Sequence, residues 1–287
     1  MLKPPLYKLF LSLAFCALLS AVLSGCASQP EAPVLNNLTG DTLNITTARL
    51  DALLPADVLL LGEQHDADAH QQLHSNAIAL LAQRGLLAAV VLEMADAGRT
   101  TAGLHPSSTE QQTRNALKWD DKSWPWQAYG PAVMTAVRAD VLVLGANLPR
   151  EQIRLKMQDI ALDGQLSGPA LKAQQQLIRI GHCNLLPESQ ITPMTRIQIA
   201  RDISMADTLV KAALPGKVVL LLSGSGHADR LLGVPQHLPS TVAVKAVRMR
   251  AGAALEADMA EAFDAVWQTA ALPDKDYCAE FKAQMGK

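Results

Sequence analysis

Two apolar runs that each end in a Gly-x-x-His sequence constrain this chain more than any other feature. The first is Val58–His65, which reads VLLLGEQH, and the second is Val218–His227, which reads VVLLLSGSGH. An unbroken apolar run of this length, stopped by glycine, is typical of a strand buried on both faces. Parallel strands end at one edge of their sheet, so we expect both sequences to form one site there.

Strands and helices alternate along most of the chain. The pattern predicts strands at residues 57–62, 88–92, 140–144, 217–223, 242–247 and 262–267, and helices at 47–54, 66–85, 110–118 and up to 139. This order predicts an α/β fold, a mostly parallel sheet with helices on both faces. Residues 150–214 are almost wholly helical in pattern, with breaks expected at Gly164, Gly168-Pro169, 181–187 and Pro193. We expect them to form a helical cap insertion over the strand edge, within an α/β domain at 47–287.

The composition excludes two classes of protein. Of the 287 residues, 49% are hydrophobic and 18% are charged, which is ordinary for a globular domain and argues against disorder. The formal net charge is −2, so no basic field is available for nucleic acid. We therefore expect no nucleic-acid partner.

The N-terminus has the pattern of an export signal. Lys3 and Lys8 precede an apolar segment at 9–23, and Leu23-Ser24-Gly25-Cys26 resembles the lipobox of bacterial lipoproteins. We expect residues 1–25 to be a signal peptide, Cys26 to carry a lipid, and 26–46 to be a lipidated tether. Ala27 resembles the sorting residue of lipoproteins anchored in the outer membrane and facing the periplasm. The alternative is an ordinary secretory signal with an incidental cysteine.

Two cysteines remain in the chain after Cys26. Cys183 and Cys278 would meet an oxidising compartment after export, where paired cysteines are usually disulfide-bonded. We expect a Cys183–Cys278 disulfide. Two buried free thiols are the alternative.

Polar residues follow four of the predicted strands, where parallel strands would bring them together. Nitrogen and carboxylate donors of this kind suit a divalent transition metal or general acid–base chemistry. Each residue could instead cap the helix that follows its strand. The residues are Glu63, His65, Glu93, Asn147 and His227.

Two further groups of residues allow a structural or a binding role. His70 and His74 are four residues apart, so they share one face of the helix that follows the first strand. That face points either to the sheet edge or into the core. The segment Trp124–Tyr129 provides core packing, or else a flat apolar surface for a planar ligand with Tyr129 as an anionic oxygen donor.

A series of short motifs resembles one known family. They occur at residues 61–66 (LGEQHD), 91–94 (VLEM), 126–129 (WQAY), 145–150 (GANLPR), 224–227 (GSGH) and 233–235 (GVP). In this order they resemble the ChaN-like haem-binding lipoproteins of the Tiki/TraB/erythromycin-esterase superfamily, over roughly residues 45–250. The paired Gly-x-x-His with the strand-end Glu93 is the most specific part.

This resemblance implies a periplasm-facing lipoprotein that acts in haem or iron uptake, with haem often held between two protomers. A homodimer around haem and an outer-membrane haem or iron receptor are therefore expected partners. The cofactor-binding candidates are Tyr129, His65, His70, Trp126 and His227. The alternative is a Tiki-like periplasmic metal-dependent hydrolase of peptide or ester bonds. Its metal-ligating and catalytic residues would be Glu63, His65, Glu93 and His227.

Overall fold

The computed structural model describes residues 40–253 and 261–285. The expected signal peptide, the expected lipidation of Cys26 and most of the expected tether lie outside the described residues. Helix α1 (Gly40–Asp51) begins seven residues before the helix predicted at 47–54. Thr46 and Leu50 of this helix are fully buried, which shows that its second half packs against the domain.

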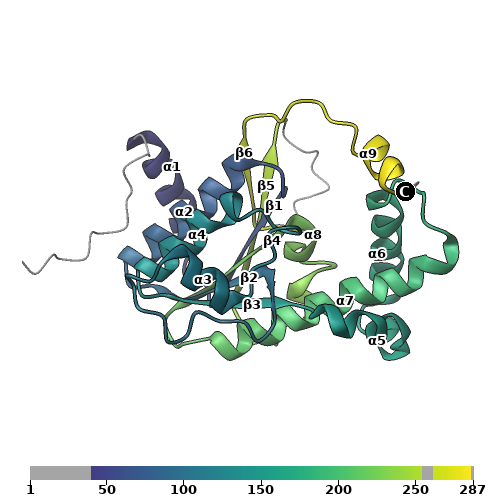
Figure 1. Cartoon of the computed structure of the whole chain (residues 1–287), viewed down its shortest axis with the longest axis horizontal. Helices are drawn as coiled ribbons and strands as arrows, with labels where there is room; N and C mark the ends of the chain where they lie inside the picture. Colours follow the sequence, from purple (N-terminus) through teal and green to yellow (C-terminus); the bar gives the residue numbers. More distant parts are fainter. Residues whose placement is uncertain (1–39, 254–260, 286–287) are drawn as a thin grey trace, which may run out of the picture. The chain divides into compact units, whose positions relative to one another are not determined.

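Six parallel strands form one sheet in the order β3-β2-β4-β1-β5-β6 (Figure 1). The predicted α/β fold is confirmed, and each predicted strand is present with ends that differ by one to four residues. The strands are β1 (Val58–Glu63), β2 (Leu87–Asp96), β3 (Leu142–Asn147), β4 (Val218–Gly224), β5 (Val244–Ala251) and β6 (Ala265–Thr269).

Helices cover both faces of this sheet. Leu59 and Leu61 of β1 share a core with α2 (Asp68–Gln83) and α4 (Trp126–Arg138). Val58 and Leu60 point the other way and share a second core with α7 (Glu188–Ala212). Successive side chains on a strand alternate between faces, so a strand covered on both sides needs the unbroken apolar run seen in the sequence.

The segment at 150–214 is helical as predicted. It contains η1 (Arg150–Gln152), α5 (Ile153–Gln158), η2 (Ile160–Gly164), α6 (Gly168–Gly181) and α7. The break predicted at Pro193 is wrong, because α7 runs through it. Ile191 and Thr195 on either side are buried, and this packing outweighs the low helix propensity of proline. The C-terminal part of α7 lies on the sheet, where Met205 and Leu209 are fully buried, so only part of 150–214 is a cap.

The remaining helices are α3 (Glu110–Leu117), α8 (Ser225–Ala228), η3 (Val234–His237) and α9 (Tyr277–Met285). The sequence pattern did not predict α9. The predicted disulfide is confirmed, because Cys278 of α9 is bonded to Cys183 just after α6. In Figure 1 α9 lies at the upper end of α6, and the rings of Phe281 and His182 are also in contact.

Among the helices that the structure describes, none combines the length and the apolar character needed to cross a membrane.

Gly62 allows α8 to pack directly on the sheet. A Cβ atom at Gly62 would lie 2.7 Å from Cα of Ser225 and 2.9 Å from Cβ of Ala228. Both distances are far inside van der Waals contact, and the first is to backbone that cannot rotate away. The glycine of the first motif therefore sets the position of the helix that carries His227.

We expect Gly62→Ala to lower the free energy of unfolding by about 1–3 kcal/mol, the usual cost of overpacking. Gly226→Ala is the matched control, because no described atom lies within 4 Å of a Cβ built there. Urea denaturation of both variants measures the difference. Equal stability of the two would show that α8 does not press on β1 as described.

Candidate functional site

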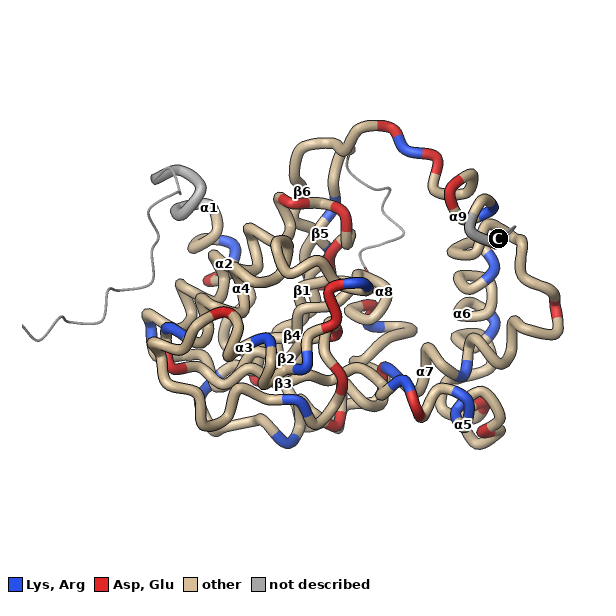
Figure 2. Tube along the Cα trace, viewed as in Figure 1, with Lys and Arg blue, Asp and Glu red and all other residues tan. Residues whose placement is uncertain are grey.

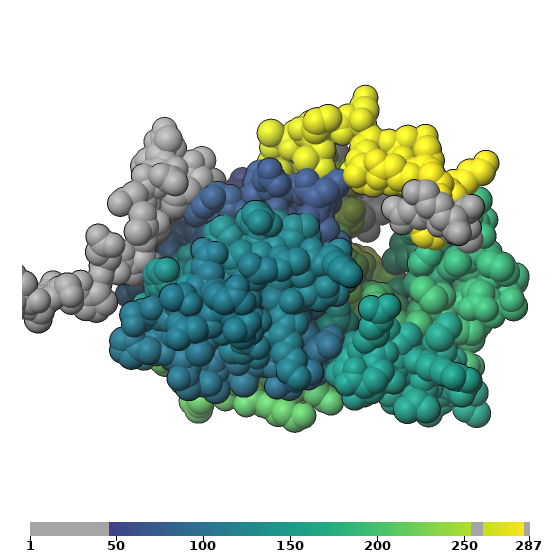
Figure 3. All heavy atoms as spheres, in the orientation of Figure 1, coloured from purple at the N-terminus to yellow at the C-terminus, as the bar shows by residue number. Residues whose placement is uncertain are grey.

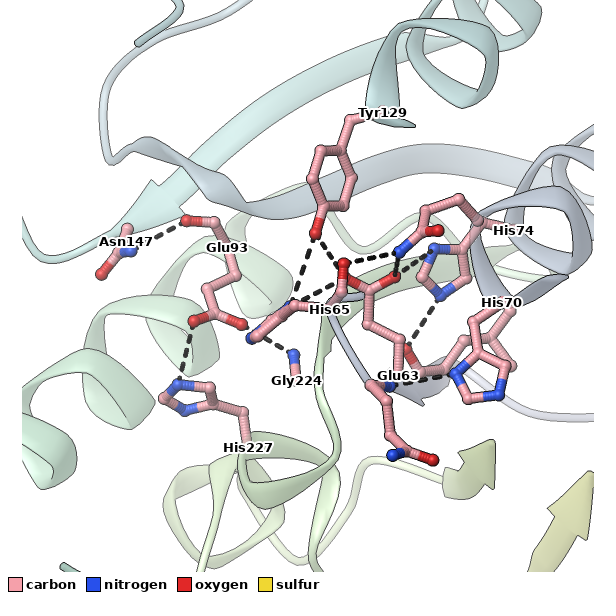
Figure 4. Close-up of polar contacts among 12 residues, drawn as sticks. Glu63, His65, His70, His74, Glu93, Tyr129, Asn147, Gly224 and His227 are labelled. Carbon is pink, nitrogen blue, oxygen red and sulfur yellow. Dashed lines mark hydrogen bonds and ion pairs between the residues drawn. The ribbon is translucent and has the colours of Figure 1, made fainter. Parts of the chain in front are cut away.

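The two Gly-x-x-His motifs lie on neighbouring strands at the centre of the sheet. β1 pairs with β4 in a register that puts Glu63 opposite Gly224. Both motifs therefore lie together at the carboxyl edge of the sheet, as expected (Figure 4). Short loops and α8 then carry His65 and His227 onward from their strands.

Glu63 is the acceptor at the centre of the first half of the site. Its Oε1 accepts the hydroxyl of Tyr129 at 2.7 Å and pairs with Nδ1 of His65 at 2.8 Å. Its Oε2 accepts the amide of Gln71 at 3.1 Å and lies 3.5 Å from Nδ1 of His74. With its side chain fully buried, this carboxylate depends on these partners in place of water.

Tyr129 is held as a neutral phenol. The residue is only 2% exposed, and burial together with the neighbouring charge of Glu63 raises the pKa of its hydroxyl far above the usual range. The hydroxyl donates to Glu63, so its proton is in use. This geometry favours a structural donor over the anionic oxygen ligand expected from the sequence.

His65 is the member of the first motif that faces the outside. Its side chain is 44% exposed and packs edge-on against Trp124, with ring centroids 5.0 Å apart. Burial lowers the pKa of His65, but the hydrogen bond to Glu63 and the charge of Glu93 outweigh it and raise the pKa overall. Because Glu63 takes Nδ1, the imidazole offers Nε2 to a ligand. Gly224 makes room for this ring, since a Cβ there would lie 2.8 Å from Nε2.

The second half of the site is a buried chain of charged groups. Oε2 of Glu93 accepts the backbone N–H of Gly224 at 2.7 Å, and its Oε1 lies 3.3 Å from Nε2 of His227. Nδ1 of His227 is in turn 2.5 Å from Oδ1 of Asp202 on α7. Gln198, one helical turn before Asp202, reaches the same imidazole at 3.2 Å.

The charges in this chain support one another. Burial alone would lower the pKa of His227, but Glu93 and Asp202 raise it to about 10, so the imidazole is protonated at neutral pH. Burial would raise the pKa of Glu93, but His227 outweighs it and lowers the pKa to about 2. Burial raises the pKa of Asp202 to about 6, although His227 opposes the shift. An imidazolium between two carboxylates is the arrangement that buried charges require.

Two other candidates, His70 and Trp126, lie away from the exposed part of the site. His70 is fully buried; its Nδ1 accepts the backbone N–H of Gln64, and its Nε2 bonds Thr269 of β6. Trp126 is 4% exposed and donates its indole N–H to Glu110 at 2.9 Å. Both side chains therefore pack in the core and connect neighbouring elements, and these positions do not favour direct contact with a ligand.

His74 and Asn147 also act as internal supports. His74 is fully buried and its Nε2 bonds the carbonyl of Leu61. Asn147 donates its side-chain amide to the carbonyl of Glu93 at 2.9 Å, which joins the ends of β3 and β2.

The four residues expected as metal ligands form two ion pairs. Glu63 pairs with His65, and Glu93 pairs with His227. Within the described ranges 40–253 and 261–285, no group of three or more His, Cys, Asp or Glu side chains is arranged to hold a metal ion.

A cavity of about 620 Å³ opens beside these residues. The space-filling view shows the surface hollowed between residues 50–150 and the helices of the 150–214 segment (Figure 3). Sequence reasoning pointed to four of the lining residues, namely His65, Glu93, Asn147 and, within the segment Trp124–Tyr129, Trp124. The others are Met94, Ala95, Asp96, Lys118, Asp120, Ser123, Leu148, Arg150, Ile153 and Arg201.

A family model described as haem-binding uptake, Tiki superfamily, ChaN matches residues 49–238. Among solved structures, one described as cofacial heme binding to ChaN of Campylobacter jejuni is similar, with 25% identity and a TM-score of 0.61. The match covers 80% of this chain and 91% of that chain. The type III effector HopBA1 matches with 14% identity and a TM-score of 0.43, covering 75% and 88% of the two chains. A search of curated protein sequences found no match.

We expect His70 to make the fold sensitive to acid. Burial lowers its pKa to about 4, so between pH 6.5 and 4 the unfolded chain binds this proton more readily than the folded chain. Stability from this group is therefore complete above pH 6.5 and is lost as pH falls toward 4. His70→Asn keeps an acceptor for Gln64 but cannot titrate, so its free energy of unfolding should fall less over that range. Urea denaturation at a series of pH values compares the two, and parallel curves would contradict the expectation.

Proposed function

The chain belongs to the haem-binding uptake family of the Tiki superfamily that includes ChaN, and on that premise we propose that it binds haem in the cavity at the carboxyl edge of its sheet and acts in haem or iron uptake. One observation carries the proposal. The family match covers residues 49–238, and the cavity is lined by residues between 65 and 201, so the matched region contains the whole cavity wall. The ChaN structure from Campylobacter jejuni, described as binding heme cofacially, supports the same ligand.

The cavity has the features that a haem site requires. Its volume of about 620 Å³ lies in the range of about 300–1,000 Å³ typical of sites for small ligands and cofactors. Trp124, Met94, Leu148 and Ile153 provide apolar and aromatic wall, and His65 provides a nitrogen donor. Haem bound there would supply an iron that takes a ligand from the protein, commonly a histidine or a tyrosine.

Of the expected ligands, His65 suits the iron best. Its ring is partly exposed on the cavity wall, and Nδ1 is fixed by Glu63, which orients the ring and raises the basicity of Nε2. Tyr129 would first have to lose a proton that Glu63 holds, at a pKa far above neutral. The buried His227 is protonated and bonded on both sides, so it has no lone pair to give.

The geometry of the site gives less support to the alternative function, a metal-dependent hydrolase. Each of its four residues is already paired with another protein group. Haem binding is therefore the function that we propose first.

We expect His65→Gly to weaken haemin binding at least tenfold, the effect commonly seen when metal ligation is disturbed, and to move the Soret band. Added imidazole should restore the wild-type spectrum, because it can occupy the space left by the side chain. Tyr129→Phe should keep that spectrum. Haemin titration followed by absorbance measures all three.

His105→Gly is the control for this series, since His105 lies in an exposed loop and contacts Ser107. If His65→Gly kept the native spectrum while Tyr129→Phe lost it, Tyr129 would be the ligand. If the wild-type protein gave no saturable Soret band, haem binding itself would be refuted.

We further propose that the protein is lipid-anchored through Cys26 in the outer membrane and faces the periplasm. The segment at 1–27 supports this, with its basic start, apolar stretch and lipobox-like sequence. The Cys183–Cys278 disulfide also fits an oxidising compartment. A homodimer around haem and an outer-membrane receptor as partner remain proposals, and the cofacial description of the Campylobacter relative is what favours the dimer.

Replacing Cys26 with serine tests the anchor. The Cys26→Ser variant should lose incorporation of labelled palmitate and move from the membrane fraction to the soluble fraction of the cell envelope. Ser28→Ala, a change two residues away, should alter neither property. A Cys26→Ser variant that stays with the membrane would overturn the proposed lipid anchor.

A further inference from the structure

The amino edge of the sheet, opposite the cavity, carries an apolar surface that haem binding does not use. Three loops lead into the neighbouring strands β4, β1 and β5 at this edge. Each loop contains a Leu-Pro pair, at Leu214-Pro215, Leu54-Pro55 and Leu238-Pro239. All three prolines are exposed, and Leu214 is 52% exposed. Apolar residues that gather on one surface, instead of being scattered singly, indicate contact with another surface.

Two apolar recesses lie among these loops, with volumes of about 560 and 290 Å³. Asp57 lines both of them, so the two recesses adjoin. Its carboxylate accepts the backbone N–H of Ala243 at 2.8 Å, so this acid is engaged within the edge. The apolar lining residues include Leu54, Pro55, Leu86, Val210, Leu214 and Val242.

Lysines flank the exposed leucine of this edge. Lys211 lies in the last turn of α7, Lys217 directly precedes β4, and both are exposed. Basic and acidic residues are interspersed along the fold (Figure 2), so lysines alone do not distinguish the edge. Their place beside an apolar loop does, because a lysine stem covers apolar surface while its ammonium group stays at a polar boundary. The interface of a phospholipid bilayer binds amphipathic surfaces of this kind.

The proposed lipid anchor brings a bilayer within reach of the edge. Residues 27–39, a stretch of 13 residues, lie between Cys26 and the start of α1 at Gly40. A chain of that length spans at most about 45 Å when fully extended. Leu54 then follows the end of α1 by only three residues. Such a short connection raises the effective concentration of a second contact, so a weak surface is enough to hold the domain.

We propose that the amino edge, with Leu214 and its flanking lysines, rests on the phospholipid surface of the membrane that holds the anchor. The inference rests on the proposed lipid anchor and adds an orientation to it. The cavity lies at the carboxyl edge of the same sheet, so it opens away from the bilayer. Haem and any partner protein therefore reach the cavity from the aqueous side.

A second group of exposed apolar residues provides an internal control. Ile160 of η2 is 75% exposed, which is more than Leu214. Helices α5 and α6 of the same segment lie on the other side of the sheet from α1 (Figure 1), and they border the hollow surface beside the cavity (Figure 3). A bilayer against Ile160 would therefore give the opposite orientation, with the cavity toward the membrane.

Tryptophan placed at each position reports which surface contacts lipid. The lipidated chain with Leu214→Trp or Ile160→Trp is reconstituted in vesicles of phosphatidylethanolamine and phosphatidylglycerol, with or without bromine atoms on the acyl chains. Bromine quenches tryptophan only at close approach, and the wild-type chain gives the background from its own tryptophans. Leu214→Trp should lose most of its added fluorescence in brominated vesicles. Ile160→Trp, although more exposed, should lose none.

Two further variants test the surface around Leu214. Val210→Trp, in the wall of the same recess, should be quenched as Leu214→Trp is. Lys217→Glu added to Leu214→Trp should reduce the quenching in vesicles that contain phosphatidylglycerol, because it replaces attraction to anionic lipid with repulsion. Unchanged quenching would remove the lysine from the proposed surface. The replaced side chains are exposed, so every variant should keep the wild-type Tm.

Three results would overturn the orientation while leaving the anchor intact, in an experiment where the wild-type chain floats with the vesicles. One is quenching of Ile160→Trp as strong as that of Leu214→Trp or stronger. Another is quenching of neither variant. The third is a blue shift of Leu214→Trp that depends on protein concentration and not on bromine, which would assign the edge to a second copy of the chain. A wild-type lipidated chain that does not float with the vesicles would refute the anchor, and the inference with it.

Discussion

The pairing of β1 with β4 is the constraint on which the site depends. These strands come from parts of the chain about 160 residues apart, yet their register puts Glu63 opposite Gly224 at the centre of the sheet. Glycine is needed there because the ring of His65 lies over it, and Gly62 is needed because α8 packs against it. A shift of register by one residue would turn each apolar side chain to the opposite face. The two buried cores therefore fix the same register that brings His65 and His227 to one edge.

Strand alternation also explains why the site has two halves. Glu63 continues the side of β1 that faces α2 and α4, and there it meets Tyr129 and Gln71. Glu93 points to the opposite side of its strand and meets His227, which Asp202 of α7 holds. Each carboxylate thus draws its partners from a different helical layer. The exposed imidazole of His65 lies at the edge, bonded to one carboxylate and within the electrostatic influence of the other.

The sequence predicted the residues that follow the ends of strands, because their positions depend on the apolar pattern within each strand. Apolar runs ended by glycine identify β1 and β4, and parallel topology places Glu63, His65, Glu93 and His227 together. Residues that reach the site from helices carry no such signal, since which face of α7 meets the edge is decided by tertiary packing. Asp202 and Arg201 were missed for this reason.

Other differences between expectation and structure have the same origin. The sequence left Tyr129 either as part of a packed aromatic segment or as a ligand, and it carried no signal that the position of α4 beside β1 brings the hydroxyl of Tyr129 to Glu63. The end of the chain lacked the periodicity needed to predict α9. The cysteine count predicted a contact that the periodicity could not, because a disulfide brings Cys278 next to Cys183.

The short helix α9 links the disulfide to the site. Next to Cys278, the hydroxyl of Tyr277 donates to Asp66, the residue that follows His65. The chain between the bonded cysteines spans 95 residues and includes α7, β4 and α8, which together carry Arg201, Gly224 and His227. In the chain-entropy model, closing a loop of this length lowers the conformational entropy of the unfolded chain, and this raises the free energy of unfolding by about 4–5 kcal/mol. The covalent bond therefore stabilises the folded chain, including the segment that builds the second half of the site, and it does so only where the cysteines are oxidised.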